Sequence, residues 1–331
     1  MARRPVAITD RFERRIDYLR VSVTDRCNLR CVYCAPEKKR RFIPRRELLA
    51  PGEIARFVGV ALRHGLRRVR ITGGEPLLRA DLPEIISSVK SLGVRDVSLT
   101  TNGVLLEEMA PVLRRAGLDR VNVSLDTLRP ARYAEITGGG DIRRVRRGME
   151  AAEALGLSPV KINVVPIRGT NDDEVADFAA LTLERDVHIR FIEYMPVGRT
   201  SICLKGKCVT KGELMEQVSR LGRLRKLPFR GAGPSRNYRL EGARGILGFI
   251  SPVSEHFCDH CNRLRLTAAG RVKPCLLSKA EIDIKAPLRG GAEDEELEAL
   301  FLRAVGVKPR GHRLAEGEPL PDLPSMSEIG G

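Results

Sequence analysis

The stretch YLRVSVTDRCNLRCVYCAP, residues 18–36, joins a predicted strand to a group of cysteines. Its first part, residues 18–24, is rich in apolar and β-branched side chains, a composition typical of a strand. Its second part places Cys27, Cys31 and Cys34 at C-x-x-x-C-x-x-C spacing. A structural zinc ion binds four ligands, whereas a [4Fe–4S] cluster held by three cysteines keeps one iron open. The spacing therefore predicts a reactive cluster, with zinc as the alternative if a fourth ligand comes from elsewhere in the chain.

The same unit of strand and polar loop recurs through the first 195 residues. Further β-rich segments lie at residues 68–72, 96–100, 120–125, 160–167 and 187–194. Between them lie segments with helical periodicity, such as PGEIARFVGVALRHG, LPEIISSVKSLG and DDEVADFAALTLER. Alternating strands and helices predict an α/β fold with a parallel sheet, and six units favour a partial (β/α)6 TIM-like barrel over a flat sheet. The pattern leaves open whether the barrel closes.

Unusual residues follow the C-terminal ends of these predicted strands. After the cysteines of the first unit, the later units end in Gly73-Gly74-Glu75-Pro76, Thr101-Asn102-Gly103, Ser124 with Asp126, and Met195-Pro196-Val197-Gly198. In a parallel barrel these ends share one face, where ligands bind. We therefore expect the motifs to form one site, with the glycines allowing a close approach of backbone to ligand.

The alternation of strands and helices breaks down after residue 197. Gly, Pro and basic residues increase there, and a second cysteine triplet appears in CDHCNRLRLTAAGRVKPC. We predict two parts, a barrel at 1–197 and a smaller α+β region at 198–331 that ends in a flexible tail with Gly330 and Gly331.

Composition narrows the class of protein. Lys and Arg outnumber Asp and Glu by 58 to 42, a net charge of +16 that favours an anionic partner: nucleic acid, nucleotide or phosphorylated metabolite. Five Tyr, nine Phe and no Trp leave few stacking platforms for a single-strand binder, which favours a small anion over nucleic acid. No stretch predicts a membrane helix or a secretory signal, so a cytoplasmic location is expected. Eight cysteines in such a chain indicate metal binding rather than disulfides.

The cysteine spacing, Tyr33 before the last cysteine, and GGEP one strand later together resemble the radical S-adenosylmethionine (SAM) superfamily. The resemblance implies that Cys27, Cys31 and Cys34 hold a [4Fe–4S] cluster whose open iron binds SAM. It further implies that SAM is contacted by Tyr33, Gly74, Ser124 and Met195.

The second triplet is formed by Cys258, Cys261 and Cys275. Its spacing alone leaves zinc open, since His256 or His260 would complete a Cys3His set. Together with C-x-x-C-N-R-x-R-x-T, EYMPVG and the terminal Gly330-Gly331, however, it resembles the GTP 3',8-cyclase (molybdenum cofactor biosynthesis protein A) family. The resemblance implies a second [4Fe–4S] cluster that binds the guanine of GTP, and a tail that reaches into the site. The residues it assigns to GTP are Arg20, Arg70, Thr101, Lys161, Arg263, Leu264 and Arg265.

The reaction implied by the resemblance is a lyase reaction, the first step of molybdenum cofactor biosynthesis. SAM yields methionine and a 5'-deoxyadenosyl radical, which removes the ribose 3' hydrogen of GTP. Attack of C3' on guanine C8 then gives (8S)-3',8-cyclo-7,8-dihydroguanosine 5'-triphosphate. The implied partners are a one-electron reductant and cyclic pyranopterin monophosphate synthase, which receives the product. The oligomeric state stays open between monomer and homodimer, and Cys203 and Cys208 receive no role.

Two other functions compete with this interpretation. A radical SAM enzyme that modifies a peptide or RNA shares the first motif and often a second cluster. A zinc-dependent nucleic-acid-binding protein would explain the charge and the C-x-x-C pair, but it would leave GGEP unexplained.

Overall fold

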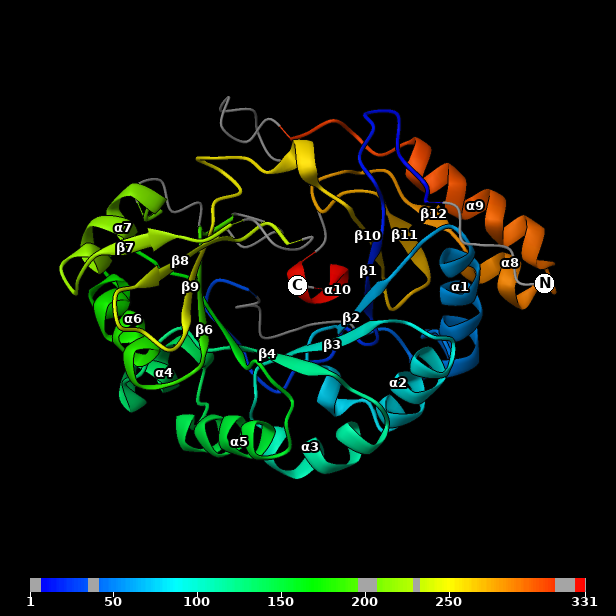
Figure 1. Cartoon of the computed structure of the whole chain (residues 1–331). Coiled ribbons are helices and arrows are strands. Elements are labelled where there is room, and N and C mark those ends of the chain that lie inside the picture. The colour runs from blue at the N-terminus through cyan, green and yellow to red at the C-terminus, as the bar shows by residue number, and fades with distance from the viewer. Residues whose placement is uncertain (1–6, 35–41, 196–206, 229–232, 313–324, 331) are drawn as a thin grey trace.

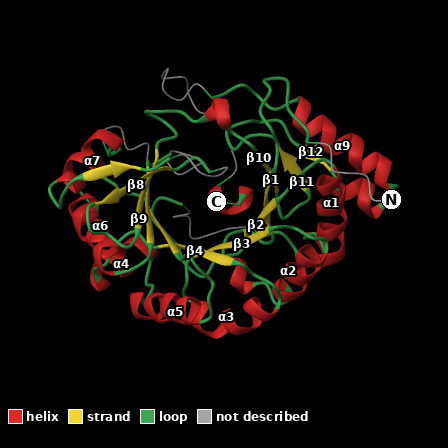
Figure 2. Ribbon diagram, viewed as in Figure 1, coloured by secondary structure: helices red, strands yellow, loops and turns green. Residues whose placement is uncertain are grey.

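A computed structural model describes residues 7–34, 42–195, 207–228, 233–312 and 325–330 of the chain. A curved sheet surrounds a central space, and helices cover its outer face (Figures 1 and 2). The sheet has twelve strands in the order β12-β11-β10-β1-β2-β3-β4-β5-β6-β9-β8-β7. Among the described residues, β12 and β7 are therefore the two edge strands of the sheet. The predicted partial barrel with a C-terminal α+β region is confirmed.

Six parallel neighbours form the centre of the sheet. They are β1 (Tyr18–Ser22), β2 (Arg68–Thr72), β3 (Asp96–Thr101), β4 (Arg120–Ser124), β5 (Lys161–Val164) and β6 (His188–Ile192). All six predicted strands are present, although the first, fourth, fifth and sixth are shorter than expected. Thr101, expected just after the third strand, is its last residue.

Ten helices are described. They are α1 (Pro51–Arg63), α2 (Leu82–Ser91), α3 (Leu106–Arg115), α4 (Pro130–Thr137), α5 (Ile142–Ala154), α6 (Val175–Glu184), α7 (Lys211–Ser219), α8 (Lys285–Arg289), α9 (Asp294–Gly306) and α10 (Met326–Ile329). The start of α1 shows why a helix begins at this point of the sequence. Pro51 occupies the first turn, and the Glu53 carboxylate accepts the Ala50 N–H at 2.6 Å, so an otherwise unpaired donor is satisfied. Ile54, Phe57 and other apolar side chains on one face are buried against the sheet.

The C-terminal part of the chain extends the same sheet at both edges. On one edge β10 (Arg263–Leu266) lies parallel to β1 and continues into β11 (Arg271–Lys273) and β12 (Ile282–Asp283). On the other edge β9 (Ile246–Ile250) lies parallel to β6 and continues into β8 (Arg236–Leu240) and β7 (Leu224–Lys226). The predicted boundary after residue 197 falls within residues 196–206, outside the described part of the chain.

Strand register sorts side chains between the outer core and the central space. On β1, Leu19 and Val21 belong to the hydrophobic core, so Tyr18, Arg20 and Ser22 face the other way. One row of paired positions crosses five strands and contains Arg265, Arg20, Arg70, Ser98 and Arg120. Partners in neighbouring strands point to the same face, so four arginines of this row face the central space.

None of the described helices combines the length and the apolar character needed to cross a membrane.

Candidate functional site

The loop with the first cysteine triplet leaves β1 and is held by the Gly73-Gly74-Glu75 turn after β2. The Gly74 N–H donates to the Thr24 carbonyl at 2.7 Å, and the Glu75 N–H donates to the Arg26 carbonyl at 2.7 Å. A Cβ on Gly73 would lie 2.6 Å from the Thr24 oxygen, and one on Gly74 would lie 2.3 Å from the Arg26 oxygen. The close approach that these glycines make in the structure is therefore to the backbone that leads into Cys27.

Glu75 is fully buried and ties this turn to the end of β3. Its carboxylate accepts the Thr101 hydroxyl at 2.7 Å, the Asn102 N–H at 2.7 Å and the Leu77 N–H at 3.0 Å. Burial raises the pKa of Glu75 to about 7, although these three donors act in the opposite direction. The family resemblance assigns Thr101 to GTP; in the structure its hydroxyl also accepts the Gly103 N–H at 3.0 Å, so its hydrogen bonds serve the turn.

Asn102 extends this network to the cysteine loop, a contact that sequence analysis missed. Its side-chain amide donates to the Asn28 side-chain oxygen at 2.7 Å and lies 3.8 Å from Cys27 Sγ. The Leu29 N–H also points at Cys27 Sγ, at 3.4 Å. Neutral donors around a thiolate stabilise its charge, as cluster ligation requires.

A hydrogen bond between Tyr33 and Asp126 connects the cysteine loop to the segment after β4. The Tyr33 hydroxyl donates to Asp126 at 2.5 Å, and the Val165 N–H donates to the same carboxylate at 2.8 Å. Burial raises the pKa of Asp126 to about 6. Burial, together with the negative charge of Asp126, also raises the pKa of Cys31 well above its usual range. A Cys31 thiolate at this position therefore needs a bound cation, such as iron, to be stable.

Each triplet brings its three sulfurs near one another. The three sulfurs of each set are close enough to influence one another electrostatically, and none of the six forms a disulfide within the described residues. No group of three or more Cys, His, Asp or Glu side chains in the described ranges converges on a point that a single ion could fill. In a cubane cluster each cysteine binds a different iron, so such convergence is not required.

The other two residues assigned to SAM belong to separate units of the barrel, one on β4 and one after β6. Ser124 ends β4, opposite Asn163 of β5. Met195, three residues after β6, packs against Ile329 of α10, as do Leu276 and Leu277. Pro196, Val197 and Gly198 lie outside the described residues.

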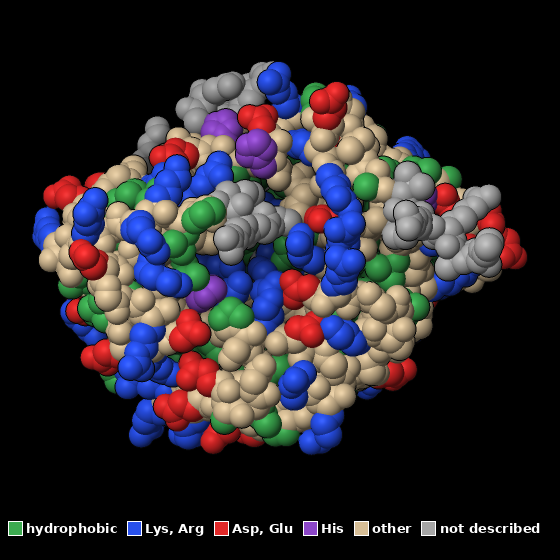
Figure 3. Space-filling model, in the orientation of Figure 1, with side chains coloured by type: hydrophobic (Ala, Val, Ile, Leu, Met, Phe, Trp, Pro, Cys, Tyr) green, Lys and Arg blue, Asp and Glu red, His purple; other side chains and the backbone are tan. Residues whose placement is uncertain are grey.

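The central space between the triplets is strongly cationic. Figure 3 shows Lys and Arg side chains lining the hollow in the middle of one face. Arg20 and Arg265 are buried neighbours in the sheet, and Arg70 stacks on the Tyr18 ring at 5.5 Å. Lys161, in β5, has its pKa lowered to about 6 by burial and then by neighbouring arginines. An anion bound here would relieve this repulsion.

Two further cations of this space, Arg190 and Arg120, were not predicted from the sequence. Burial and neighbouring arginines lower the pKa of Arg190 to about 9, and its guanidinium lies 3.3 Å from the Asn122 side-chain oxygen. Arg120 pairs with Asp96, but its buried Nη1 has no hydrogen-bond partner among the described residues. Both lie on strands, at positions that face the central space. The alternation of inward-facing and outward-facing residues within RVNVS and HIRFI is the sequence pattern from which they could have been predicted.

The second triplet lies at the opposite end of the barrel from the first. Cys261 precedes β10, whereas Cys27 follows β1, and these two strands are parallel and paired from Tyr18 with Arg263 onward. At about 3.3 Å per residue, the five residues of β1 separate the two ends by roughly 16 Å. The four arginines of the inner row therefore lie between the triplets.

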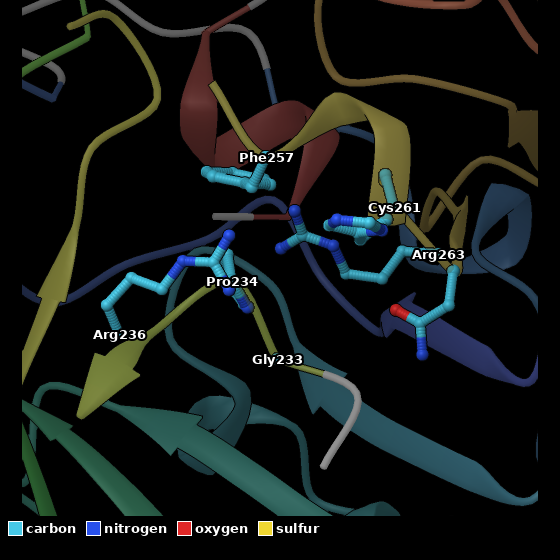
Figure 4. Close-up of a pocket in the computed structure, with 8 residues that line it drawn as sticks. Gly233, Pro234, Arg236, Phe257, Cys261 and Arg263 are labelled. Carbon is cyan, nitrogen blue, oxygen red and sulfur yellow. The ribbon is translucent and has the colours of Figure 1, made fainter. Parts of the chain in front are cut away.

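A pocket borders the second triplet, lined in part by Cys261, Asn262 and Arg263. In Figure 4, Arg236 of β8 and Arg263 of β10 point toward each other beside the Phe257 ring, and the Arg263 guanidinium lies 5.0 Å from the centre of that ring. Burial raises the pKa of Cys261, but the charges of Arg263 and Lys308 outweigh it and bring the value to about 6. Arg236 and Phe257 were not predicted. The backbone of Leu264 pairs with Leu19, and its side chain belongs to the core.

The end of the chain returns to the centre of the sheet (Figure 1). The Arg265 guanidinium donates to the Gly330 carbonyl. Gly330 has φ +84°, and a Cβ there would lie 2.7 Å from both Ser22 Cβ and Thr72 Oγ1. Glycine therefore allows the tail to rest against the ends of β1 and β2, although Gly331 lies outside the described residues.

Neither of the two cysteines outside the triplets receives a role in this site. Cys208 forms an isolated bridge with Ile167, and Cys203 falls outside the described part of the chain.

Comparison with known proteins agrees with this geometry. The radical SAM superfamily matches residues 21–182, and Molybdenum Cofactor Synthesis C matches residues 187–314. A GTP 3',8-cyclase from Heliobacterium modesticaldum is 52% identical over 328 residues, covering 97% of this chain and 99% of that protein. One from Pelotomaculum thermopropionicum is 50% identical over 327 residues, with the same coverage.

Solved structures show the same fold at low identity. Native anSMEcpe with bound AdoMet and a Kp18Cys peptide has a TM-score of 0.58 at 15% identity, covering 90% of this chain and 82% of that one. SuiB from Streptococcus suis, bound to S-adenosylmethionine, has a TM-score of 0.56 at 17% identity, covering 86% of this chain and 67% of that one. The chain therefore belongs to the radical SAM superfamily and, within it, to the GTP 3',8-cyclase family.

Proposed function

We infer that this protein is a GTP 3',8-cyclase, which converts GTP to (8S)-3',8-cyclo-7,8-dihydroguanosine 5'-triphosphate at the start of molybdenum cofactor biosynthesis. Family membership supports the reaction. The observation that carries the proposal is the placement of a buried cationic row between two cysteine triplets at opposite ends of one barrel.

The first triplet would hold the SAM-binding cluster. When bound there and reduced, such a cluster would supply the electron for splitting SAM into methionine and the 5'-deoxyadenosyl radical. The chain's contribution is to orient SAM through the backbone at Gly74 and through Tyr33, Ser124 and Met195. Met195 also packs against Ile329 of α10, so the same side chain would contact both SAM and the C-terminal tail.

The substrate would lie in the cationic space, with its base toward the second triplet. Arg20, Arg70, Lys161 and Arg265 supply charge for the triphosphate, and guanidinium groups offer paired hydrogen bonds to phosphate oxygens. The pocket at Arg263 and Phe257 supplies a surface for the base beside Cys261. With SAM at the first triplet and the base at the second, the ribose would lie between them, within reach of the radical formed from SAM.

We further propose that a one-electron reductant serves the first cluster and that cyclic pyranopterin monophosphate synthase receives the product. The oligomeric state, monomer or homodimer, is a separate measurement.

The test is anaerobic reconstitution with iron and sulfide, reduction in the presence of SAM, and quantification of 5'-deoxyadenosine with GTP, with ATP, and without nucleotide. We expect release that depends on GTP, together with a product isomeric with GTP. Release that is indifferent to GTP would assign the chain to another radical SAM reaction.

A further inference from the structure

A buried lysine, Lys308, lies directly behind the second cysteine triplet. It follows the C-terminal end of α9, and only 2% of its surface is exposed. Its ammonium donates to the Arg263 carbonyl at 2.8 Å and to the Pro274 carbonyl at 2.8 Å, and it lies 3.4 Å from Cys261 Sγ. An ammonium has three donors and no acceptor, so these three contacts use its full capacity.

The three acceptors come from both arms of the triplet. Arg263 stands two residues after Cys261, whereas Pro274 immediately precedes Cys275. Lys308 therefore joins two segments that are separated by the 13 residues between these cysteines. The triplet is held together by this side chain as well as by the pairing of β10 with β11.

The segment after Lys308 is itself fixed to the triplet. The Arg14 guanidinium donates to the carbonyls of Cys258 at 2.8 Å, Arg310 at 2.7 Å and Pro309 at 2.7 Å. Asp10 holds Arg14 through a buried ion pair at 2.7 Å. Lys308 thus has little freedom to turn away from the sulfur.

The charge of Lys308 is balanced differently from that of its neighbour Lys273. Lys273 is equally buried, at 1% exposed, but its ammonium pairs with the Glu281 carboxylate at 2.7 Å. No carboxylate pairs with Lys308 within the described ranges, and the Cys261 sulfur, which is a thiolate when it ligates metal, is the acceptor that faces the ammonium. Burying an unpaired charge is costly, so the ammonium and the thiolate stabilise each other.

We propose that Lys308 is a positioning residue for the second cluster: it orients Cys261 and Cys275 for ligation and biases the bound cluster toward its reduced state. The cluster itself is part of the proposed function, on which this inference rests. Reduction adds negative charge, and a fixed cation hydrogen-bonded to a ligating sulfur favours that charge.

The test uses the full chain with Cys27, Cys31 and Cys34 replaced by alanine, so that only the second site is filled. The site is reconstituted with iron and sulfide, and its reduction potential is measured by EPR-monitored redox titration without SAM or GTP. The variants are Lys308→Met, which removes donors and charge; Lys308→Arg, which keeps the charge; and Lys273→Met, the matched control.

If the ammonium favours the reduced cluster tenfold, Lys308→Met lowers the potential by about 59 mV. Iron loss to a chelator should become about tenfold faster in the same variant, as expected for removal of a group that supports a metal ligand. Lys308→Arg should recover most of the potential, and Lys273→Met should leave it near the parent value. An unchanged potential in Lys308→Met, or an equal shift in Lys273→Met, would overturn the proposal.

Two outcomes separate this inference from the proposed function. If Lys308→Met takes up no cluster while its melting temperature matches the parent, the orienting role is supported by the loss of ligation alone. If the parent chain forms no reducible cluster at the second triplet, the inference fails together with the cofactor assignment. GTP-dependent release of 5'-deoxyadenosine by the wild type tests the proposed function separately.

Discussion

Replacing Gly74 with alanine should disconnect the cysteine loop from the sheet. The new Cβ would lie 2.3 Å from the Arg26 carbonyl oxygen, 2.6 Å from its carbon and 2.8 Å from the Asp25 oxygen. Real Cβ contacts essentially never fall under 3.0 Å, so the two backbones must separate by at least 0.7 Å, the difference between 3.0 and 2.3 Å. Because the obstructing atoms are backbone, no side-chain rotation relieves the clash.

The expected cost is about 1–3 kcal/mol in the free energy of unfolding, as for other overpacked sites. Displacement of Cys27 by this distance should also reduce SAM cleavage about 100-fold. The first cluster should be lost or depleted while the second is retained, so iron content falls from about eight toward about four per chain. Iron analysis, thermal melting and 5'-deoxyadenosine release check these three expectations.

Gly59→Ala is the matched control. Gly59 lies within α1, and a Cβ there meets nothing within 4 Å. Alanine is the better helix former, so stability should rise by about 0.5–1 kcal/mol with iron content unchanged. If Gly74→Ala kept its full iron content and its melting temperature, the argument that the glycine turn positions the cysteine loop would be wrong.

Three further predictions concern the cationic space. Arg265→Ala should raise the KM for GTP about 10- to 100-fold, because a lost charge-assisted hydrogen bond costs about 1.5–3 kcal/mol; unchanged kinetics would remove this residue from the phosphate site. Burial and neighbouring cations hold the pKa of Lys161 near 6 without substrate, and a triphosphate should restore its charge. GTP binding at pH 8 should therefore take up about one proton, with affinity falling as pH rises above about 6; calorimetry in two buffers measures this, and undiminished uptake in Lys161→Met would contradict it. Gly330→Ala should displace the tail and lower turnover at unchanged iron content, since φ is +84° and Ser22 is 2.7 Å away; full turnover would show that this close contact is dispensable.

The local parts of the site were predictable because they depend on short spacings. Cys27, Cys31 and Cys34 fall within one loop, and the strand that carries Arg20 shows its own alternation of apolar and polar residues. The GGEP turn was recognisable, but its tightest contact in the structure is with backbone 48 residues earlier, at Arg26. Spacing within a motif could not reveal that contact.

Other contributions depend on which strands become neighbours. Arg190 and Arg120 enter the site because strand register brings them to the inner face, and Arg236 enters because β8 pairs with β9 on the far side of β6. Lys308 reaches Cys261 across 47 positions in the sequence, and Arg14 reaches Cys258 across 244. These contacts follow from sheet order, which local propensity does not specify.

By itself, the sequence determined the six central strands, the thiolates available for metal and the family to which the chain belongs. Local hydrophobic periodicity and covalent spacing carry that information over a few residues. Only the tertiary structure decided that β10 pairs with β1, and this one pairing places the second triplet at the far end of the barrel from the first. The cationic row, the tail at Gly330 and Lys308 acquire their places from that pairing, because parallel strands fix which side chains share a face and an end.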